Sequence, residues 1–152
     1  MPVKIGDCMY GDGALGANNP AEKVEQEASK IWCESNNTSQ FQSRVKCFVS
    51  LGTGDGGINP VSDKAWKFLT KSLARVATET EATAEAVARR WSNLDNEPYF
   101  RFNVQRGLQA VGLAEWKYIG LLEAATDGYL DIEDTIPRIA RCVDILRTKE
   151  CW

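Results

Sequence analysis

The segment formed by residues 12–20 holds the residues of this chain that are best suited to chemistry. Its sequence is Asp12-Gly13-Ala14-Leu15-Gly16-Ala17-Asn18-Asn19-Pro20. A short strand is expected before it and a helix after it, and open α/β sheets place their sites at the carboxyl ends of strands. Asp12 is therefore a candidate catalytic residue. Asp-Gly is also a common turn dipeptide, so a turn without catalysis remains the alternative on the residues alone.

The residue types of the chain exclude several kinds of site. The chain has no histidine, so neither a Ser-His-Asp triad nor a Cys-His pair can be completed within it, and histidine-based metal ligation is excluded as well. The five cysteines show no Cys-x-x-Cys spacing, which favours reduced thiols over a zinc site or a disulfide framework. Cys47 lies in an apolar run and is expected to be a small buried hydrophobic residue. No metal or organic cofactor is expected.

Residues 12–20 resemble the aspartate motif of patatin-like phospholipases, which is written Asp-Gly-Gly or Asp-Gly-Ala followed shortly by Asn-Pro. Downstream, residues 49–54 (Val-Ser-Leu-Gly-Thr-Gly) resemble the family's strand ending in Ser-Leu-Gly-Thr-Gly. Residues 99–104 resemble a late strand of the same domain, and residues 77–81 are similar to fungal members. The resemblance implies that residues 1–152 form the C-terminal portion of a patatin-like domain.

Members of this family are lipid acyl hydrolases with a Ser-Asp dyad. The resemblance implies that Asp12 is the aspartate of that dyad. This residue would take the proton of the catalytic serine and return it to the leaving group. The resemblance also implies that the loop around Asp12 is shaped by Gly13, Ala14, Asn18, Asn19 and Pro20. Gly13 is expected to permit the tight turn that presents the carboxylate. The implied substrates are glycerolipid acyl esters at a lipid or membrane surface.

Two parts of the family's machinery are missing from the chain. No Gly-x-Ser-x-Gly occurs between Met1 and Trp152, and no glycine-rich loop precedes Asp12. Residues 1–152 therefore lack the N-terminal part that carries the nucleophile and the oxyanion loop, and we expect the isolated chain to be inactive. The alternative is a truncated, non-catalytic remnant whose late helices act as a binding or regulatory module.

Hydrophobic periodicity and turn residues predict an α/β fold with a parallel-type sheet and several helices. Strands are expected at residues 3–10, 45–51 and 99–104, and helices from Asn19 onward, after Ser62, at residues 113–125 and at residues 135–146. Asn19 is the expected cap of the first helix, with Pro20 at its first position. Residues 35–43 are expected to be a surface loop, and the helix after Ser62 to break near residues 78–81. So few strands would leave a sheet edge open.

Other sites fit the residues less well. Residues 52–57 satisfy Gly-x-Gly-x-x-Gly, but no helix follows directly, so a glycine-rich loop is favoured over a dinucleotide site. Glu79 and Glu81 suggest a glycosidase pair, but two residues apart on a helix they point in different directions and belong on a solvated face. Core or lid packing, with a lipid-facing role as the alternative, is expected for Trp32, Trp66, Trp91 and Trp116.

The overall charge and hydrophobicity of the chain also restrict its partners. The formal net charge of −3, with both signs interspersed, argues against nucleic acid as a partner. No transmembrane span and no signal peptide are expected, which predicts a cytoplasmic protein.

Overall fold

The structure is a computed structural model. It describes residues 3–11, 13–34, 38–54, 64–95, 97–108 and 116–148, with the backbone alone at residues 14, 15 and 64–77.

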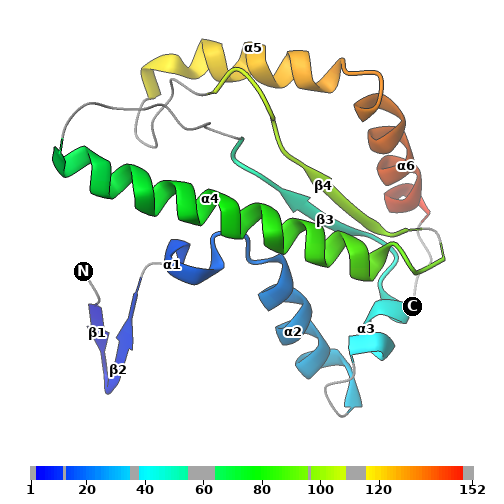
Figure 1. Cartoon of the computed structure of the whole chain (residues 1–152). Coiled ribbons are helices and arrows are strands. Elements are labelled where there is room, and N and C mark those ends of the chain that lie inside the picture. Colours follow the sequence, from blue (N-terminus) through cyan, green and yellow to red (C-terminus); the bar gives the residue numbers. More distant parts are fainter. Residues whose placement is uncertain are drawn as a thin grey trace.

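The N-terminal segment forms a hairpin. Strands β1 (Val3–Ile5) and β2 (Cys8–Tyr10) pair in antiparallel register, with Val3 opposite Tyr10. Gly6, at φ +60°, permits the tight connection between them. The hairpin stands apart from the other elements (Figure 1), and all six strand residues are exposed. The single strand predicted for residues 3–10 is therefore wrong, because Gly6 and Asp7 turn the chain back on itself.

The second sheet pairs β3 (Phe48–Leu51) with β4 (Tyr99–Phe102) in parallel, with Phe48 opposite Tyr99 and Leu51 opposite Phe102. The sequence predicted both strands and their parallel direction. Among the described residues this parallel sheet has only two strands. The mixture of helices and strands is compatible with the predicted α/β class. The apolar run of residues 45–51 does not bury both faces of β3, because Leu51 is 76% exposed.

Helix α4 (Lys64–Trp91) is the longest element of the chain, with 28 residues. The break predicted near residues 78–81 is wrong. Neither glycine nor proline occurs between Lys64 and Trp91, so the backbone hydrogen-bond ladder has no local reason to stop.

The parallel sheet lies between α4 and α6 (Thr135–Arg147), as Figure 1 shows. Because side chains alternate along a strand, β4 presents different residues to the two helices. Phe48 of β3 contacts both Tyr99 and Trp91 of α4, with ring centroids 5.3 and 5.2 Å apart. On the opposite face, the guanidinium groups of α6 lie over Phe100 and Phe102. This layering gives both faces of β4 a helix to pack against, while the face of β3 that carries Val49 and Leu51 remains exposed.

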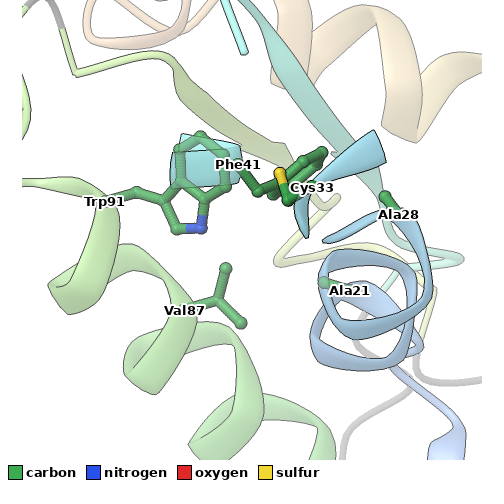
Figure 2. Close-up of a cluster of buried hydrophobic side chains, with 6 residues drawn as sticks. All are labelled: Ala21, Ala28, Cys33, Phe41, Val87 and Trp91. Atoms are coloured by element: carbon green, nitrogen blue, oxygen red, sulfur yellow. The ribbon is translucent and has the colours of Figure 1, made fainter. Parts of the chain in front are cut away.

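The main core lies where α2 (Ala21–Trp32) and α3 (Thr38–Arg44) meet the C-terminal part of α4. Figure 2 shows its six buried side chains, which are Ala21, Ala28, Cys33, Phe41, Val87 and Trp91. Trp91 and Val87 are both fully buried.

Helix α3 replaces most of the surface loop predicted for residues 35–43, of which residues 35–37 lie outside the described part. Its sequence is polar, but Phe41 is buried and stacks on Trp32 with ring centroids 6.3 Å apart. The contact of one aromatic side chain with the core outweighs the weak local preference.

The C-terminal helices differ in detail from the prediction. Helix α5 (Ile119–Leu130) follows a short 3₁₀ turn, η2 (Trp116–Tyr118), and ends later than predicted. Helix α6 begins where predicted, but its apolar stripe is largely exposed: Ile136, Val143 and Leu146 are 54, 42 and 59% exposed. Within the described residues, no helix combines the length and the hydrophobicity needed to cross a bilayer.

Candidate functional site

Asp12 itself lies outside the described residues, but the chain on both sides of it is described. Strand β2 ends at Tyr10, and helix α1 (Ala14–Ala17) begins two residues after Asp12. The strand before Asp12 belongs to the antiparallel hairpin, so the expectation that Asp12 follows a strand of the parallel sheet is wrong. The strand-to-helix position of the motif is nevertheless observed.

The turn after Asp12 needs glycine at a different place from the one expected. Gly13 precedes α1 with φ −58° and ψ −25°, a right-handed conformation open to any residue, and its carbonyl accepts a hydrogen bond from the Ala17 N–H at 2.8 Å. Gly16, by contrast, has φ +135°, which side chains of other residues rarely permit. The conformational freedom expected at Gly13 is thus required at Gly16.

Two asparagines attach the motif to α4. Asn18 Nδ2 donates to Oγ1 of Thr80 at 2.9 Å, and Asn19 Nδ2 donates to the carbonyl oxygen of Thr80 at 3.2 Å. Asn19 is only 7% exposed, and its Oδ1 also accepts from the Ala21 N–H at 3.2 Å. The predicted helix start is wrong by one residue: α2 begins at Ala21 with Pro20 at the cap position, although the Asn19 side chain still accepts from the first N–H of the helix.

Thr80 was not identified from the sequence as part of this site. It lies in the middle of α4, about sixty residues from the asparagines, and no local pattern marks it. A narrow cavity of about 20 Å³ lies between the motif and α4, beside these hydrogen bonds. It is lined by residues 16–19 together with Glu79, Thr80 and Thr83. Its size suits a single water molecule rather than a substrate.

The second and third motifs of the resemblance are brought together as the neighbouring strands β3 and β4. Beyond the ladder, the N–H of Gly52 donates to the Phe102 carbonyl at 2.8 Å. The N–H of Gly54, which has φ +92°, donates to Oδ1 of Asn103 at 2.9 Å. A Cβ at Gly52 would overlap the side chain of Asn103. The glycines therefore allow the two strand ends to approach each other closely.

Cys47 lies half-buried just before β3, and its Sγ is 3.8 Å from Sγ of the buried Cys142 on α6. Burial, together with the neighbouring thiol, raises the pKa of Cys47 to about 11. Because the thiolate is the nucleophilic form, Cys47 is poorly suited to nucleophilic catalysis at neutral pH. The expected packing role fits this environment.

The remaining candidate residues are dispersed. Glu79 and Glu81 are exposed on α4, which agrees with a solvated face. Gly57, the third glycine of the dinucleotide pattern, lies outside the described residues. Of the tryptophans, Trp91 is fully buried, Trp32 and Trp116 are 63 and 77% exposed, and the Trp66 side chain is not described. Core packing is thus confirmed for Trp91 alone.

Comparison with known proteins points to phospholipases. The chain is 30% identical over 96 residues to Phospholipase A I of Arabidopsis thaliana, covering 62% of this chain and 7% of that protein. It is 28% identical over 99 residues to Calcium-independent phospholipase A2-gamma of Mus musculus, covering 65% of this chain and 12% of that protein. No protein-family model matches the chain. No solved structure matches it either.

The chain spans only a small part of the length of these two relatives. The similarity nevertheless agrees in kind with the resemblance carried by residues 12–20 and 49–54, since both lead to enzymes that act on lipid esters. Over somewhat less than two thirds of its length, the chain is distantly similar to parts of two phospholipases.

Proposed function

We propose that this chain is the C-terminal part of a patatin-like acyl hydrolase domain that cleaves glycerolipid acyl esters at a lipid surface. The observation that carries the proposal is the occurrence, in order, of the Asp12 motif and the motif of residues 49–54 in a chain similar to two phospholipases. The chain contributes Asp12 as the general base of a Ser-Asp dyad.

The reaction follows from the chemistry of the dyad. The Asp12 carboxylate accepts the proton of a serine hydroxyl while the serine oxygen attacks the ester carbonyl carbon. The bond to the glycerol oxygen then breaks, and the alcohol leaves with the proton held by Asp12. A water molecule hydrolyses the acyl-serine in the same way and restores both groups. The serine must come from a Gly-x-Ser-x-Gly turn, which residues 1–152 do not contain.

The described residues would serve this reaction by holding the loop in place. Asn18 and Asn19 hydrogen-bond to Thr80 on the longest helix, so the segment after Asp12 is attached to a rigid element. A base held in a fixed position needs little reorganisation in the transition state. Isolated residues 1–152 are expected to show no specific esterase activity, because they supply the base without the nucleophile.

The test begins with the natural transcript. Its frame is translated upstream of Met1, and the encoded protein is assayed for release of fatty acid from phospholipid vesicles. An in-frame Gly-x-Ser-x-Gly and turnover are expected, and Asp12→Asn should lower kcat by roughly 10³-fold or more. Asp127→Asn, the same change at an exposed position of α5, is the matched control and should leave the rate unchanged.

Turnover that survives Asp12→Asn would remove Asp12 from the mechanism. An in-frame stop directly before Met1 would overturn the hydrolase proposal in favour of a non-catalytic binding module. That second function is favoured by one observation: the apolar side chains Ile136, Val143 and Leu146 on α6 are exposed. Such a stripe is available to a partner protein.

A further inference from the structure

An open cavity of about 380 Å³ lies where β4 ends, between α4, α5 and α6. Among the described residues, its lining combines the three arginines Arg101, Arg106 and Arg138 with Glu81, Asn103 and Tyr129. The carboxyl ends of parallel strands are the usual position of ligand sites in α/β folds. This cavity is separate from the narrow one beside residues 16–19.

Two of the arginines are held by specific contacts. Arg101 is 14% exposed, and its Nη1 donates to Oγ of Ser50 on β3 at 2.9 Å. Arg138 donates through Nη2 to the Arg101 carbonyl at 2.9 Å, and its guanidinium lies over the Phe102 ring, 5.6 Å from the centroid. Both groups are thus fixed in orientation before a ligand arrives, which lowers the entropic cost of binding.

The positive charge of the cavity is not balanced by its own carboxylate. Oε1 of Glu81 lies 3.8 Å from Nη2 of Arg101, beyond hydrogen-bond distance, and the Glu81 side chain is 59% exposed. Arg106 forms no ion pair within the described part of the chain. Guanidinium groups that share one cavity repel each other, and an anion between them relieves that repulsion.

We infer that this cavity binds the phosphate group of a monoester or diester. Guanidinium groups match phosphate oxygens in paired hydrogen bonds, which makes arginine the residue of choice for this anion. Tyr129 also lines the cavity, and its side chain carries a hydroxyl group that can donate to an anion. Arg106 is exposed and unpaired in the described structure, so it is free to turn toward the ligand.

The phosphate has two chemical sources, a soluble phosphate ester and the headgroup of a phospholipid. Only the lipid source rests on the function proposed above, since it would place the headgroup of the substrate beside the sheet. The soluble source requires no hydrolysis and no Asp12. Binding is therefore measured without turnover, so that failure of the site and failure of the proposed function give different results.

The first experiment titrates the 152-residue chain with inorganic phosphate and with glycerol 3-phosphate by isothermal calorimetry. Arg106→Gln and Arg138→Gln should each weaken binding roughly tenfold, because each removes a charge-assisted hydrogen bond. Glu81→Gln should tighten binding, because it removes the competing negative charge. Arg106 makes no described contact that folding needs, so its variant keeps the test valid if Arg138→Gln unfolds the chain.

Arg141→Gln is the matched control. Arg141 also lies on α6 and also contacts the region of β4. Its guanidinium lies 4.9 Å from the Phe100 centroid, and its Nη2 donates to the carbonyl of Glu97, just before β4, at 3.0 Å. It does not line the cavity. Phosphate affinity should be unchanged in this variant. Equal weakening in the Arg106 and Arg141 variants, or no measurable phosphate binding by the unaltered chain, overturns the site.

The second experiment distinguishes the two sources by co-sedimentation with vesicles. Vesicles of phosphatidylcholine alone are compared with vesicles that also contain phosphatidic acid. Binding that needs phosphatidic acid, is lost in Arg106→Gln and is kept in Arg141→Gln assigns the site to a lipid headgroup. Binding of glycerol 3-phosphate without vesicle binding assigns it to soluble esters, which supports the site and separates it from the proposed hydrolysis. Failure of both probes overturns the inference.

Discussion

Nη2 of Arg90 on α4 lies 3.0 Å from Oε2 of Glu25 on α2, a carboxylate only 2% exposed. The other carboxylate oxygen accepts a hydrogen bond from Nε2 of Gln42 on α3 at 2.6 Å. Three helices therefore meet at one buried negative charge. Arg90→Met is expected to lower the free energy of unfolding by about 3 kcal/mol, because it leaves that charge buried without its cation. Urea unfolding of the chain measures the loss.

A surface pair on the same helix α2 provides the control. Nζ of Lys30 lies 2.6 Å from Oε1 of Glu27, but the two side chains are 53 and 65% exposed. Lys30→Met should change the free energy of unfolding by no more than about 0.5 kcal/mol, since water replaces the lost partner. Equal losses in the Lys30 and Arg90 variants would show that burial of Glu25 is unimportant.

The elements with strong local signals were predictable from the sequence. The apolar run of residues 45–51 and the aromatic run of residues 99–104 each gave a strand, and the regular apolar spacing after Thr135 gave α6. The break near residues 78–81 was predicted without a glycine or proline to cause it, and α4 continues through it. Helix α3 was missed because a single aromatic residue, Phe41, holds its polar sequence against the core.

The spatial relationships between distant residues were not predictable. Nothing near Thr80 indicates that it receives hydrogen bonds from Asn18 and Asn19. The arginine-lined cavity was missed for the same reason: Arg101 and Arg138 come from separate elements and meet only when α6 packs on β4. A balanced overall charge concealed this local excess of positive charge, since net charge does not record where the charges lie.

Gly52→Ala is expected to destabilise the protein by roughly 1–3 kcal/mol, because the added methyl group overlaps the side chain of Asn103. That side chain cannot move freely, since its Oδ1 accepts the N–H of Gly54. Thermal unfolding followed by circular dichroism reports the loss.

The opposite sign is expected for Gly128→Ala in α5. A Cβ at Gly128 would meet no atom within 4 Å, and alanine should stabilise the helix by about 0.5–1 kcal/mol. If both variants shift the unfolding temperature in the same direction, the close approach at Gly52 does not govern stability.

Alkylation should separate Cys47 from the exposed Cys8. The pKa of Cys47 is raised to about 11, first by burial and then by the neighbouring Cys142, so very little thiolate is present at pH 8. Iodoacetamide at pH 8 should therefore modify Cys8 many times faster than Cys47, as read from peptide masses over time. Labelling of Cys47 at the rate of Cys8 would contradict this environment.

The same raised pKa predicts how stability depends on pH. The unfolded chain releases the Cys47 proton near its ordinary pKa of 9.0, whereas the folded chain retains it until about 11. Between these values the folded state binds more protons than the unfolded state. The contribution of Cys47 to the free energy of unfolding is therefore complete below pH 9, and it is lost as the pH rises from 9 through 11. Cys47→Ala should show a smaller decline in unfolding free energy over that range than the unaltered chain.

Asn19→Ala should lower the free energy of unfolding by about 1–2 kcal/mol. The change removes the acceptor for the first N–H of α2 and a donor to the Thr80 carbonyl, at a site only 7% exposed. Asn18→Ala removes one exposed hydrogen bond to Thr80 and should cost at most about 0.5 kcal/mol, because water replaces it. Urea unfolding of the two variants gives the comparison. Losses of the same size would mean that the buried asparagine does not fix the segment following Asp12, so that α4 would not hold this segment in place.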